Sequence, residues 1–280
     1  MTTTPISSSG SSHLSSYVTR LNGRPATADE LAPLAFAGYA HFTAIQVRDG
    51  GIRGLDLHLD RLRNASGELF GRALPDERVR ELLRDALATG PADLSLKATV
   101  YSREGEFTPA DPSAALDLLV STAPPANGPS GPLSLAVVPY ERPLPEIKHV
   151  GEIAKTYYPR LLAAEGFDDV AFVDGAGRFS EASIWNLVFW DGTSVIWPEA
   201  RMLRGTMMGT VRRQLTRLGV PQEDREVTPA DLTSLAGAAV LNSWTPVVPV
   251  HRIGTTSVPA APEFASLLRR AHEAEPLVAP

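Results

Sequence analysis

The spacing of apolar residues divides the first half of the chain into short strands and helices. Residues 42–47 predict a strand, and the turn at 48–51 leads into a second short strand near Ile52, so that the two form a hairpin. Apolar residues that recur every three or four positions then mark helices. The other elements predicted in this half are helices at 57–70 and 76–88 and strands at 94–101 and 115–121.

A proline-rich segment separates this half from the rest. Residues 122–132 hold four prolines and two glycines, which excludes a helix or a central strand and predicts a linker. The second half begins with a strand at 133–138, and a helix from about 151 to 165 ends at Gly166, in the usual stop position. Its other predicted elements are strands at 170–173, 183–190, 194–197, 225–227, 238–242 and 247–251 and helices at 202–218 and 262–274.

This order of elements predicts a mixed α+β (α/β) protein with two domains. A chain of 280 residues is long enough for each domain to bury a core of its own. We expect a disordered tail at 1–17, a small N-terminal α/β domain at 18–121, the linker at 122–132 and a larger C-terminal domain at 133–280.

Charge and composition narrow the possible partners. The formal net charge is −6 and no run of basic residues occurs, which argues against nucleic acid or an anionic membrane and favours small molecules. The chain has no cysteine, so disulfides, thiolate metal sites and cysteine nucleophiles are excluded, and we expect no metal site. It shows neither a signal peptide nor 18 consecutive apolar residues, so we expect a cytoplasmic protein.

Lysine is scarce, and its scarcity points to chemistry. Only Lys97, Lys148 and Lys155 are lysines among the 26 cationic side chains. A lysine amine can form a Schiff base with an aldehyde, whereas arginine cannot. Lys148 is followed 33 residues later by Glu181 in a strand–turn–strand stretch, and this pair would suit the aldehyde and the ring nitrogen of pyridoxal phosphate. The alternative is an ordinary lysine at a strand end and an ordinary edge carboxylate.

Three segments could hold the phosphate of such a cofactor. Arg61 lies on the polar side of an early helix, with no carboxylate three or four positions away. The predicted helix near Gly205 offers free backbone amides at Thr206 and Met207. Ser243 supplies a hydroxyl at a strand end. Each feature is common by itself, and a solvated arginine or an ordinary helix start is the alternative for the first two.

In this order, Arg61, Lys148, Glu181, the segment from Leu203 to Thr206, and Ser243 resemble the class IV aminotransferases, the fold-type IV pyridoxal phosphate enzymes. The resemblance covers roughly 38–250. It implies that Lys148 binds the cofactor aldehyde and acts as the catalytic base, and that Glu181 contacts the pyridine nitrogen. It also implies a homodimer. The remaining roles that it implies are phosphate binding by Arg61, Thr206, Met207 and Ser243, ring contact by Leu203 and structural support by Asn186.

The chain departs from this family at several positions. Branched-chain members usually carry a tyrosine five residues after the lysine, where this chain has Ile153. The usual Gly-Ile-Thr-Arg helix start is here 205–208, Gly-Thr-Met-Met, so phosphate binding should depend on backbone amides. The segment at 38–44 and the residues around Ser243 are closer to lyase-like members. These departures favour the D-amino acid or lyase branches.

Substrate selection in this family comes from the small domain, often together with its neighbour in a dimer. Trp185 and Trp244 are candidates to close the pocket, although large aromatic residues are more often core. Lys155 is a rival Schiff-base lysine with a less suitable spacing to Glu181. The candidate substrate contacts are Tyr39, His41, Lys97, Tyr101 and Arg103, each of which has an ordinary structural alternative.

Three functions follow from these features. The leading one is a pyridoxal phosphate transaminase that acts on a D-amino acid or an (R)-amine, with a keto acid as acceptor. The second is a lyase that eliminates pyruvate from aminodeoxychorismate and yields 4-aminobenzoate. The third is a binding protein that has lost the phosphate site at 205–208.

Overall fold

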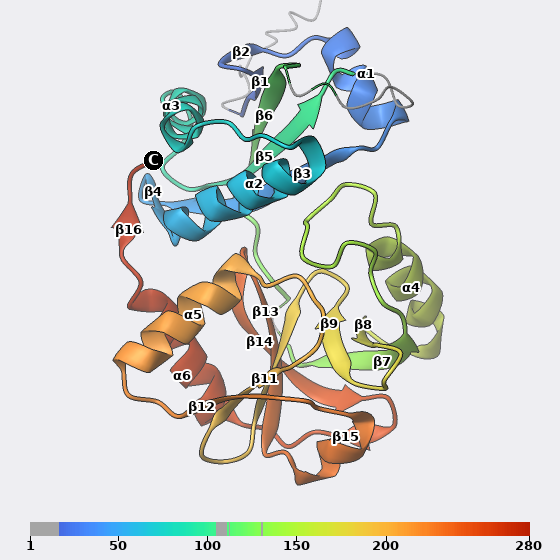
Figure 1. Cartoon of the computed structure of the whole chain (residues 1–280). Helices are drawn as coiled ribbons and strands as arrows, with labels where there is room; N and C mark the ends of the chain where they lie inside the picture. Colours follow the sequence, from blue (N-terminus) through green and yellow to red (C-terminus); the bar gives the residue numbers. More distant parts are fainter. Residues whose placement is uncertain (1–16, 105–110, 112, 130) are drawn as a thin grey trace, which may run out of the picture.

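We describe a computed structural model of the protein over residues 17–104, 111, 113–129 and 131–280. The chain forms two halves, each built on one sheet, with a junction crossed by the segment around Ala126 (Figure 1). The predicted tail at 1–17 lies, apart from Tyr17, outside the described residues. Within the described ranges, no helix is long and apolar enough to cross a membrane.

An antiparallel sheet forms the N-terminal half. In the described part of the chain its order is β16, β4, β3, β5, β6, β1, β2, with helices on both faces. The strands are β1 (Thr19–Leu21), β2 (Arg24–Pro25), β3 (Ala40–Arg48), β4 (Gly51–Arg53), β5 (Leu94–Ser102), β6 (Leu116–Ala123) and β16 (Leu277–Val278), and the helices are α1 (Ala28–Phe36), α2 (Leu55–Phe70) and α3 (Asp76–Leu87).

The alternation of side chains along β3 decides which residues reach the junction. Ile45 and Val47 point to one face and pack in the core beneath α2 and α3. Phe42 and Ala44 point to the other face and line a cavity between the two halves. The predicted hairpin and both predicted helices of this half are present, whereas α1 was not predicted.

The C-terminal half is a second, mixed sheet that closes on itself. β9 pairs with both β8 and β10, so the path from β8 through β7, β14 and β13 to β10 returns to its start. The strands are β7 (Leu133–Pro139), β8 (Asp169–Val173), β9 (Phe179–Ala182), β10 (Asn186–Trp190), β11 (Val195–Pro198), β12 (Gln222–Arg225), β13 (Gly237–Asn242), β14 (Thr245–Ile253) and β15 (Thr256–Ser257).

Helices cover the outside of this closed sheet. α4 (Ala154–Leu162) packs on β8, and α5 (Thr206–Arg217) packs with α6 (Pro262–Glu273) over β13 and β14 (Figure 1). The short 3-10 helices are η1 (Ala163–Glu165) and η2 (Pro229–Ser234). α5 begins four residues later than the predicted helix at 202–218, because Gly205 has an extended conformation and its N–H is bound by a side chain described below.

Backbone hydrogen bonds join the two halves beside Lys148. Phe42 N donates to Lys148 O at 2.9 Å, and Val150 N donates to Ala40 O at 3.0 Å. β16 also pairs with β4, so Leu277 and Val278 lie in the N-terminal sheet, whereas the predicted range of 133–280 assigned them to the second domain. Contacts from both ends of the second half therefore fix the junction.

The junction generates a prediction about stability. Arg213 of α5 donates to Asp56 of α2 at 2.6 Å and, through Nε, to the buried Glu275 at 2.9 Å. Arg213→Ala should lower the free energy of unfolding by about 2–3 kcal/mol, because the carboxylate of Glu275 would keep only Gln214 as a partner. The measurement is urea denaturation at pH 7.

The neighbouring Arg212 provides the control. Its ion pair with Asp224 is partly exposed and lies within the C-terminal half, and its guanidinium lies 5.4 Å from the ring centroid of Trp197. Arg212→Ala should cost about 1 kcal/mol or less, since exposed ion pairs contribute little. Equal losses in the two variants would mean that the contact between the halves adds nothing to stability.

Candidate active site

A cavity of about 260 Å³ lies between the two halves, and Lys148 is part of its wall. Sequence segments that are far apart in the chain meet there, as the predicted order of site residues requires. Its lining residues are Phe42, Ala44, Arg61, Lys97, Arg142, Lys148, His149, Glu152, Lys155, Glu181, Ser183, Ile184, Trp185, Asn186, Leu203, Gly205, Thr206, Asn242, Ser243 and Trp244.

Lys148 is held by its backbone and is buried at its amine. Its backbone carbonyl accepts the hydrogen bond from Phe42 N of β3, and Lys148 lies in the segment between β7 and α4. Burial, followed by the positive charges of Arg61 and Arg142, lowers the pKa of Lys148 to about 7. Near neutral pH about half of the amine is therefore uncharged and available as a nucleophile or a base, as a Schiff-base lysine needs.

Glu181 lies in β9, in register with Asn186 of β10. Burial raises its pKa to about 7, against the opposing effects of Arg142 and Lys148. Arg142 Nη1 lies 3.8 Å from Glu181 Oε1, and Arg142 Nε lies 3.6 Å from Glu152 Oε2. One guanidinium thus stands between two buried carboxylates beside the lysine.

Asn186 shapes the loop that precedes α5. Its Nδ2 donates to Leu203 O at 2.7 Å, and its Oδ1 accepts from Gly205 N at 3.0 Å. A Cβ at position 205 would collide with this oxygen, so glycine is required there. These two hydrogen bonds are how Asn186 can support the loop structurally, as expected. The backbone N–H groups in the first turn of α5 have no partner within the helix.

Thr206, the first residue of α5, has a side-chain hydroxyl that is unsatisfied among the described residues. Thr206 is buried, and its Oγ1 has no hydrogen-bond partner within the described part of the chain. Free amides at a helix N-terminus and an unpartnered hydroxyl together suit an anion. Ser243 lines the same cavity, whereas Met207 does not line it and packs in the core beneath α5. A role for Met207 can therefore come only from its backbone.

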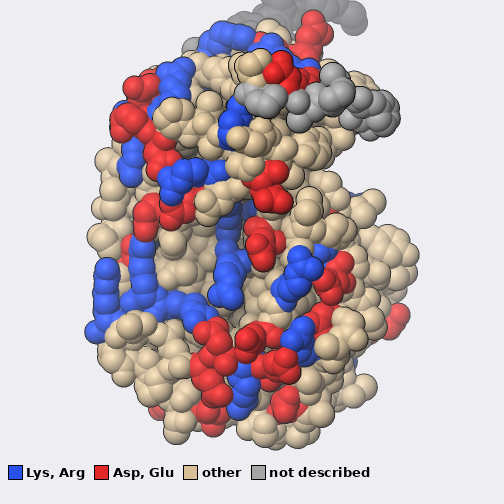
Figure 2. Space-filling view, in the orientation of Figure 1, with Lys and Arg blue, Asp and Glu red and all other residues tan. Residues whose placement is uncertain are grey.

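Arg61 extends from α2 towards this loop. Its Nη2 donates to Arg204 O at 2.9 Å, and burial, followed by the charge of Arg142, lowers its pKa to about 10. Arg61, Gly205 and Thr206 also line an open cleft at the front of the junction. Figure 2 shows Lys and Arg side chains in the hollow between the two halves. The lining of this cleft has six arginines and four carboxylates, so its excess of positive charge is small.

All three lysines of the chain surround one aromatic ring. Lys97 Nζ lies 4.2 Å, Lys148 Nζ 5.2 Å and Lys155 Nζ 5.6 Å from the centroid of Phe42. Neither Lys97 nor Lys155 forms an ion pair with a described residue, and burial lowers the pKa of both. Five Lys and Arg residues line the cavity against two carboxylates, so it favours anionic ligands.

Tyr39 and His41 do not reach this cavity. His41 alternates with Phe42 along β3, so it faces α2, where its Nε2 lies 2.8 Å from Ser66 Oγ and burial lowers its pKa to about 4. Tyr39 is exposed and donates to Leu69 O at 2.9 Å. Substrate contact by these two residues stays a prediction, which the lining of this cavity does not support.

Tyr101 and Arg103 are also occupied elsewhere. Tyr101 is buried and donates to Glu30 O in α1 at 2.6 Å. Arg103 binds Asp117 and Glu30 in ion pairs. Among the five predicted substrate contacts, only Lys97 lines the cavity, because it lies directly opposite Ala44 in the ladder of β3 and β5.

The sequence did not reveal three important members of the site. Phe42 was assigned only to a strand, although the alternation of β3 would have placed it with Ala44. Arg142 and Glu152 lie in irregular segments on either side of Lys148. A loop has no periodicity that tells which side chains turn inward, so no local signal would have found these two.

One cavity between the two halves thus contains a lysine of lowered pKa and the free start of a helix, which would suit an enzyme that holds an anionic cofactor on a lysine. The family model for amino-transferase class IV matches residues 40–253, and the chain belongs to this family. Enzymes of this class depend on pyridoxal phosphate, so that compound is the cofactor of the site, and the alternative of a binding protein is excluded.

Solved structures of this class share the fold. The branched-chain aminotransferase from Thermoproteus uzoniensis is similar with a TM-score of 0.80 at 17% identity, over 91% of this chain and 93% of that one. A hypothetical aminotransferase from Mycobacterium tuberculosis reaches 0.75 at 23% identity, over 91% and 98%. The 4-amino-4-deoxychorismate lyase from Pseudomonas aeruginosa reaches 0.75 at 22% identity, over 92% and 99%. No curated protein significantly matches the sequence.

The residues present fit the cofactor. Thr206 Oγ1 is an unpartnered donor at the start of α5, and Arg61 adds a cation beside it. Lys148 supplies the amine, and Glu181 supplies a carboxylate for the ring nitrogen. Each of these assignments is a proposal that follows from the geometry.

The assignment of the lysine can be tested directly. After incubation with pyridoxal phosphate and reduction with borohydride, mass spectrometry of peptides should find the cofactor on Lys148. Lys148→Ala should abolish both the covalent label and the visible absorption band. Lys155→Ala is the matched control and should keep both, because Lys148 is the more buried amine and has the pKa nearer neutrality. A label on Lys155 would contradict the assignment.

The pKa of Lys148 predicts the pH dependence of cofactor capture. Only the neutral amine reacts, so the capture rate should rise with pH through about 7 and then level off, well below the range of an ordinary lysine. Stopped-flow absorbance from pH 6 to 10 measures it. Arg142→Met removes one of the charges that lower this pKa, so the midpoint should move to higher pH. A rate that climbs steadily to pH 10 would contradict a buried, perturbed amine.

Proposed function

We propose that the protein is a pyridoxal phosphate-dependent transaminase that acts on a D-amino acid and uses a keto acid as acceptor. The observation that carries this proposal is the arrangement of one cavity: Lys148 beside Glu181, the free start of α5, and two further lysines that form no ion pair with a described residue. The chemistry of the first two is common to the family, whereas the two further lysines concern the substrate.

The roles of the chain's own residues follow from their positions. Pyridoxal phosphate, when bound, supplies the electron sink for the carbanion formed at the substrate α-carbon. Lys148 Nζ removes the α-proton and returns it, for which a pKa near 7 is suitable. Glu181 would pair with the ring nitrogen, and Arg61 with the amides of Thr206 and Met207 would hold the phosphate. Trp185 and Leu203 are buried in the wall and help to exclude water.

The choice of an amino acid over a simple amine rests on Lys97 and Lys155. Their amines flank Phe42, and the charge of Lys155 adds to burial in lowering the pKa of Lys97, whereas Glu152 opposes the lowering for Lys155. A substrate carboxylate between them would offset the positive charge of both amines, whereas an (R)-amine without an acid group would not. The D configuration rests on Ile153, which is 78% exposed and leaves the cavity without the tyrosine typical of branched-chain enzymes.

The same two lysines also favour a second candidate, aminodeoxychorismate lyase. Aminodeoxychorismate carries two carboxylates. Lys97 and Lys155, which lie apart from the proposed phosphate site at the start of α5, could each bind one of them. The likeness of the fold to a lyase from Pseudomonas aeruginosa is compatible with this alternative. The two candidates differ in product, since the lyase releases pyruvate and 4-aminobenzoate.

We also propose that the protein is a cytoplasmic homodimer. Large apolar side chains are exposed on α1, α4 and the segments beside them, on the same side of the molecule in Figure 1. The most exposed are Phe36, Tyr39, Ile153, Tyr157 and Leu161. A second copy of the chain would cover them, and light scattering that finds only monomer would exclude this arrangement.

The decisive experiment follows the visible spectrum of the protein loaded with pyridoxal phosphate. D-Alanine should convert the band to that of the aminated cofactor, and pyruvate should restore it, whereas L-alanine should have no effect. Conversion by L-alanine alone would reverse the proposed configuration. Formation of 4-aminobenzoate from aminodeoxychorismate, without conversion by either isomer, would establish the lyase instead.

Lysine variants test the carboxylate contact in the same assay. Lys97→Met and Lys155→Met should each raise KM for D-alanine about tenfold with little change in kcat, because they remove binding and not chemistry. The matched control substrate is (R)-1-phenylethylamine, which has no carboxylate and should be unaffected or improved. Equal losses for both donors would contradict the carboxylate contact.

A further inference from the structure

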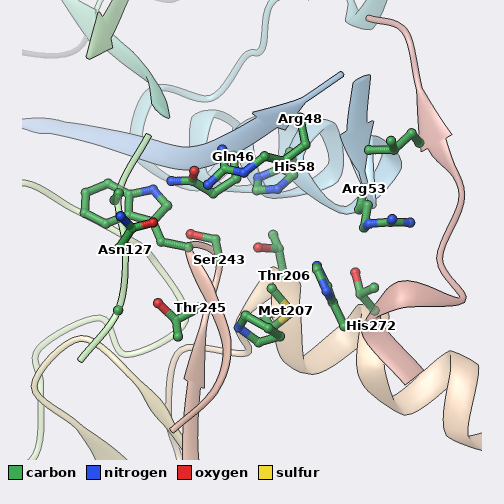
Figure 3. A pocket seen from close by; sticks show the side chains of 16 residues that line it. Gln46, Arg48, Arg53, His58, Asn127, Thr206, Met207, Ser243, Thr245 and His272 are labelled. Atoms are coloured by element: carbon green, nitrogen blue, oxygen red, sulfur yellow. The ribbon is translucent and has the colours of Figure 1, made fainter. Parts of the chain in front are cut away.

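A second cavity, of about 310 Å³, lies at the junction behind the start of α5 (Figure 3). It has Thr206, Ser243 and Trp244 in common with the first cavity, but Lys148, Arg61 and Glu181 do not line it. Its lining residues are Gln46, Arg48, Arg53, His58, Ala126, Asn127, Gly128, Thr206, Met207, Thr210, Ser243, Trp244, Thr245, Pro246, His272 and Leu277.

One strand face serves both cavities. Along β3, Phe42 and Ala44 line the first cavity, and Gln46 and Arg48, on the same face, line the second. The two cavities are therefore consecutive along the junction. The second one is walled by the N-terminal sheet on one side and by α5 and α6 on the other (Figure 3).

The charge of this lining is one-sided. Arg48 and Arg53 face the cavity, and its lining contains no Asp or Glu. Arg48 donates to Val47 O at 2.8 Å and to Leu94 O at 3.4 Å, and no described residue forms an ion pair with either arginine. The lining thus holds two partly buried guanidinium groups and no carboxylate, which suits an anionic ligand.

Histidines complete the set of donors. His272 of α6 has its pKa lowered to about 4 by burial and then by Arg53 and Arg48, although Glu275 opposes this. His58 Nδ1 is held by Thr43 Oγ1 at 2.6 Å, so only its Nε2 is left for the cavity. Both imidazoles are neutral at pH 7, and each can donate one N–H to a ligand without adding charge.

The other residues that line this cavity favour an organic ligand over an inorganic ion. Gln46 Nε2 donates to Ser95 Oγ at 2.7 Å, but Gln46 Oε1 is buried and has no partner among the described residues. This oxygen needs a donor, which a hydroxyl group on the organic part of a ligand would supply. The volume also lies in the range of sites for small organic molecules.

We propose that this second cavity binds a small phosphate monoester that also carries a hydroxyl group. The phosphate lies between Arg48 and Arg53, with His272 as a neutral donor, and the hydroxyl donates to Gln46. The site is separate from the reaction at Lys148 and does not depend on the substrate proposed above. Because the ligand contacts both halves and shares Thr206 and Ser243 with the cofactor cavity, its binding is linked to that of the cofactor.

The test uses the holoenzyme, so that the phosphate site at α5 is already occupied by the cofactor. Isothermal titration with glycerol 3-phosphate should show one site per chain, and glycerol should not bind. Inorganic phosphate should bind at least tenfold more weakly than glycerol 3-phosphate. If inorganic phosphate binds equally well, the hydroxyl contact is wrong, and absence of any binding overturns the site.

Variants locate the site and exclude general charge effects. Arg53→Met and Arg48→Met should each weaken binding at least tenfold, and melting curves verify that both remain folded. Arg53 is suited to this test because it makes no ion pair within the described chain, so its removal leaves the fold intact. Arg217→Met removes an exposed charge of α5 outside the lining and should leave binding unchanged. Unchanged binding in both cavity variants overturns the proposal.

Discussion

The structure depends on the burial of opposite charges at the junction of its two halves. Lys148 and Glu181 each cost free energy when they are buried in the charged form, and their pKa values both move to about 7. Arg142 lies between Glu181 and Glu152 and links this cluster to the loop that carries Lys148. Neither half could bury these groups alone, because the cover over the cluster comes from β3 of the N-terminal half. The energetic cost is concentrated where the chemistry takes place.

A single strand sets the chemistry of the junction. The side chains of β3 alternate strictly, so Phe42 and Ala44 face the cofactor cavity while His41 and Thr43 face α2. The register with β5 then places Lys97 opposite Ala44. A slip of β3 by one residue would place His41 and Thr43 on the cavity face instead of Phe42 and Ala44, while Lys97 of β5 would stay. The composition of this cavity wall therefore depends on the register of two strands in the small half.

Most helices and strands and the main site residues could be predicted from the sequence, whereas the positions of some strand and loop side chains could not. The helices α2, α3 and α6 and most strands have strong periodicity, and the order of Arg61, Lys148, Glu181 and Ser243 places them correctly in one cavity. His41 was chosen by residue type without regard to strand parity. Arg142 could not be predicted, since its position depends on the folded path of a loop. The return of Leu277 to the N-terminal sheet could not be predicted either, because a strand of two residues has no pattern.

The pairing of β16 with β4 has a consequence for the order of events during synthesis. Most of the N-terminal sheet can form early, but its edge at β4 remains open until Leu277 has been translated. Leu277 packs within 2.8 Å of the position that a Cβ on Gly51 would take, and it also lines the second cavity. The nascent chain thus carries an uncovered strand edge, open to wrong pairing, until the C-terminal half has been made. Pairing at this edge of the junction is therefore a late step in the folding of the chain.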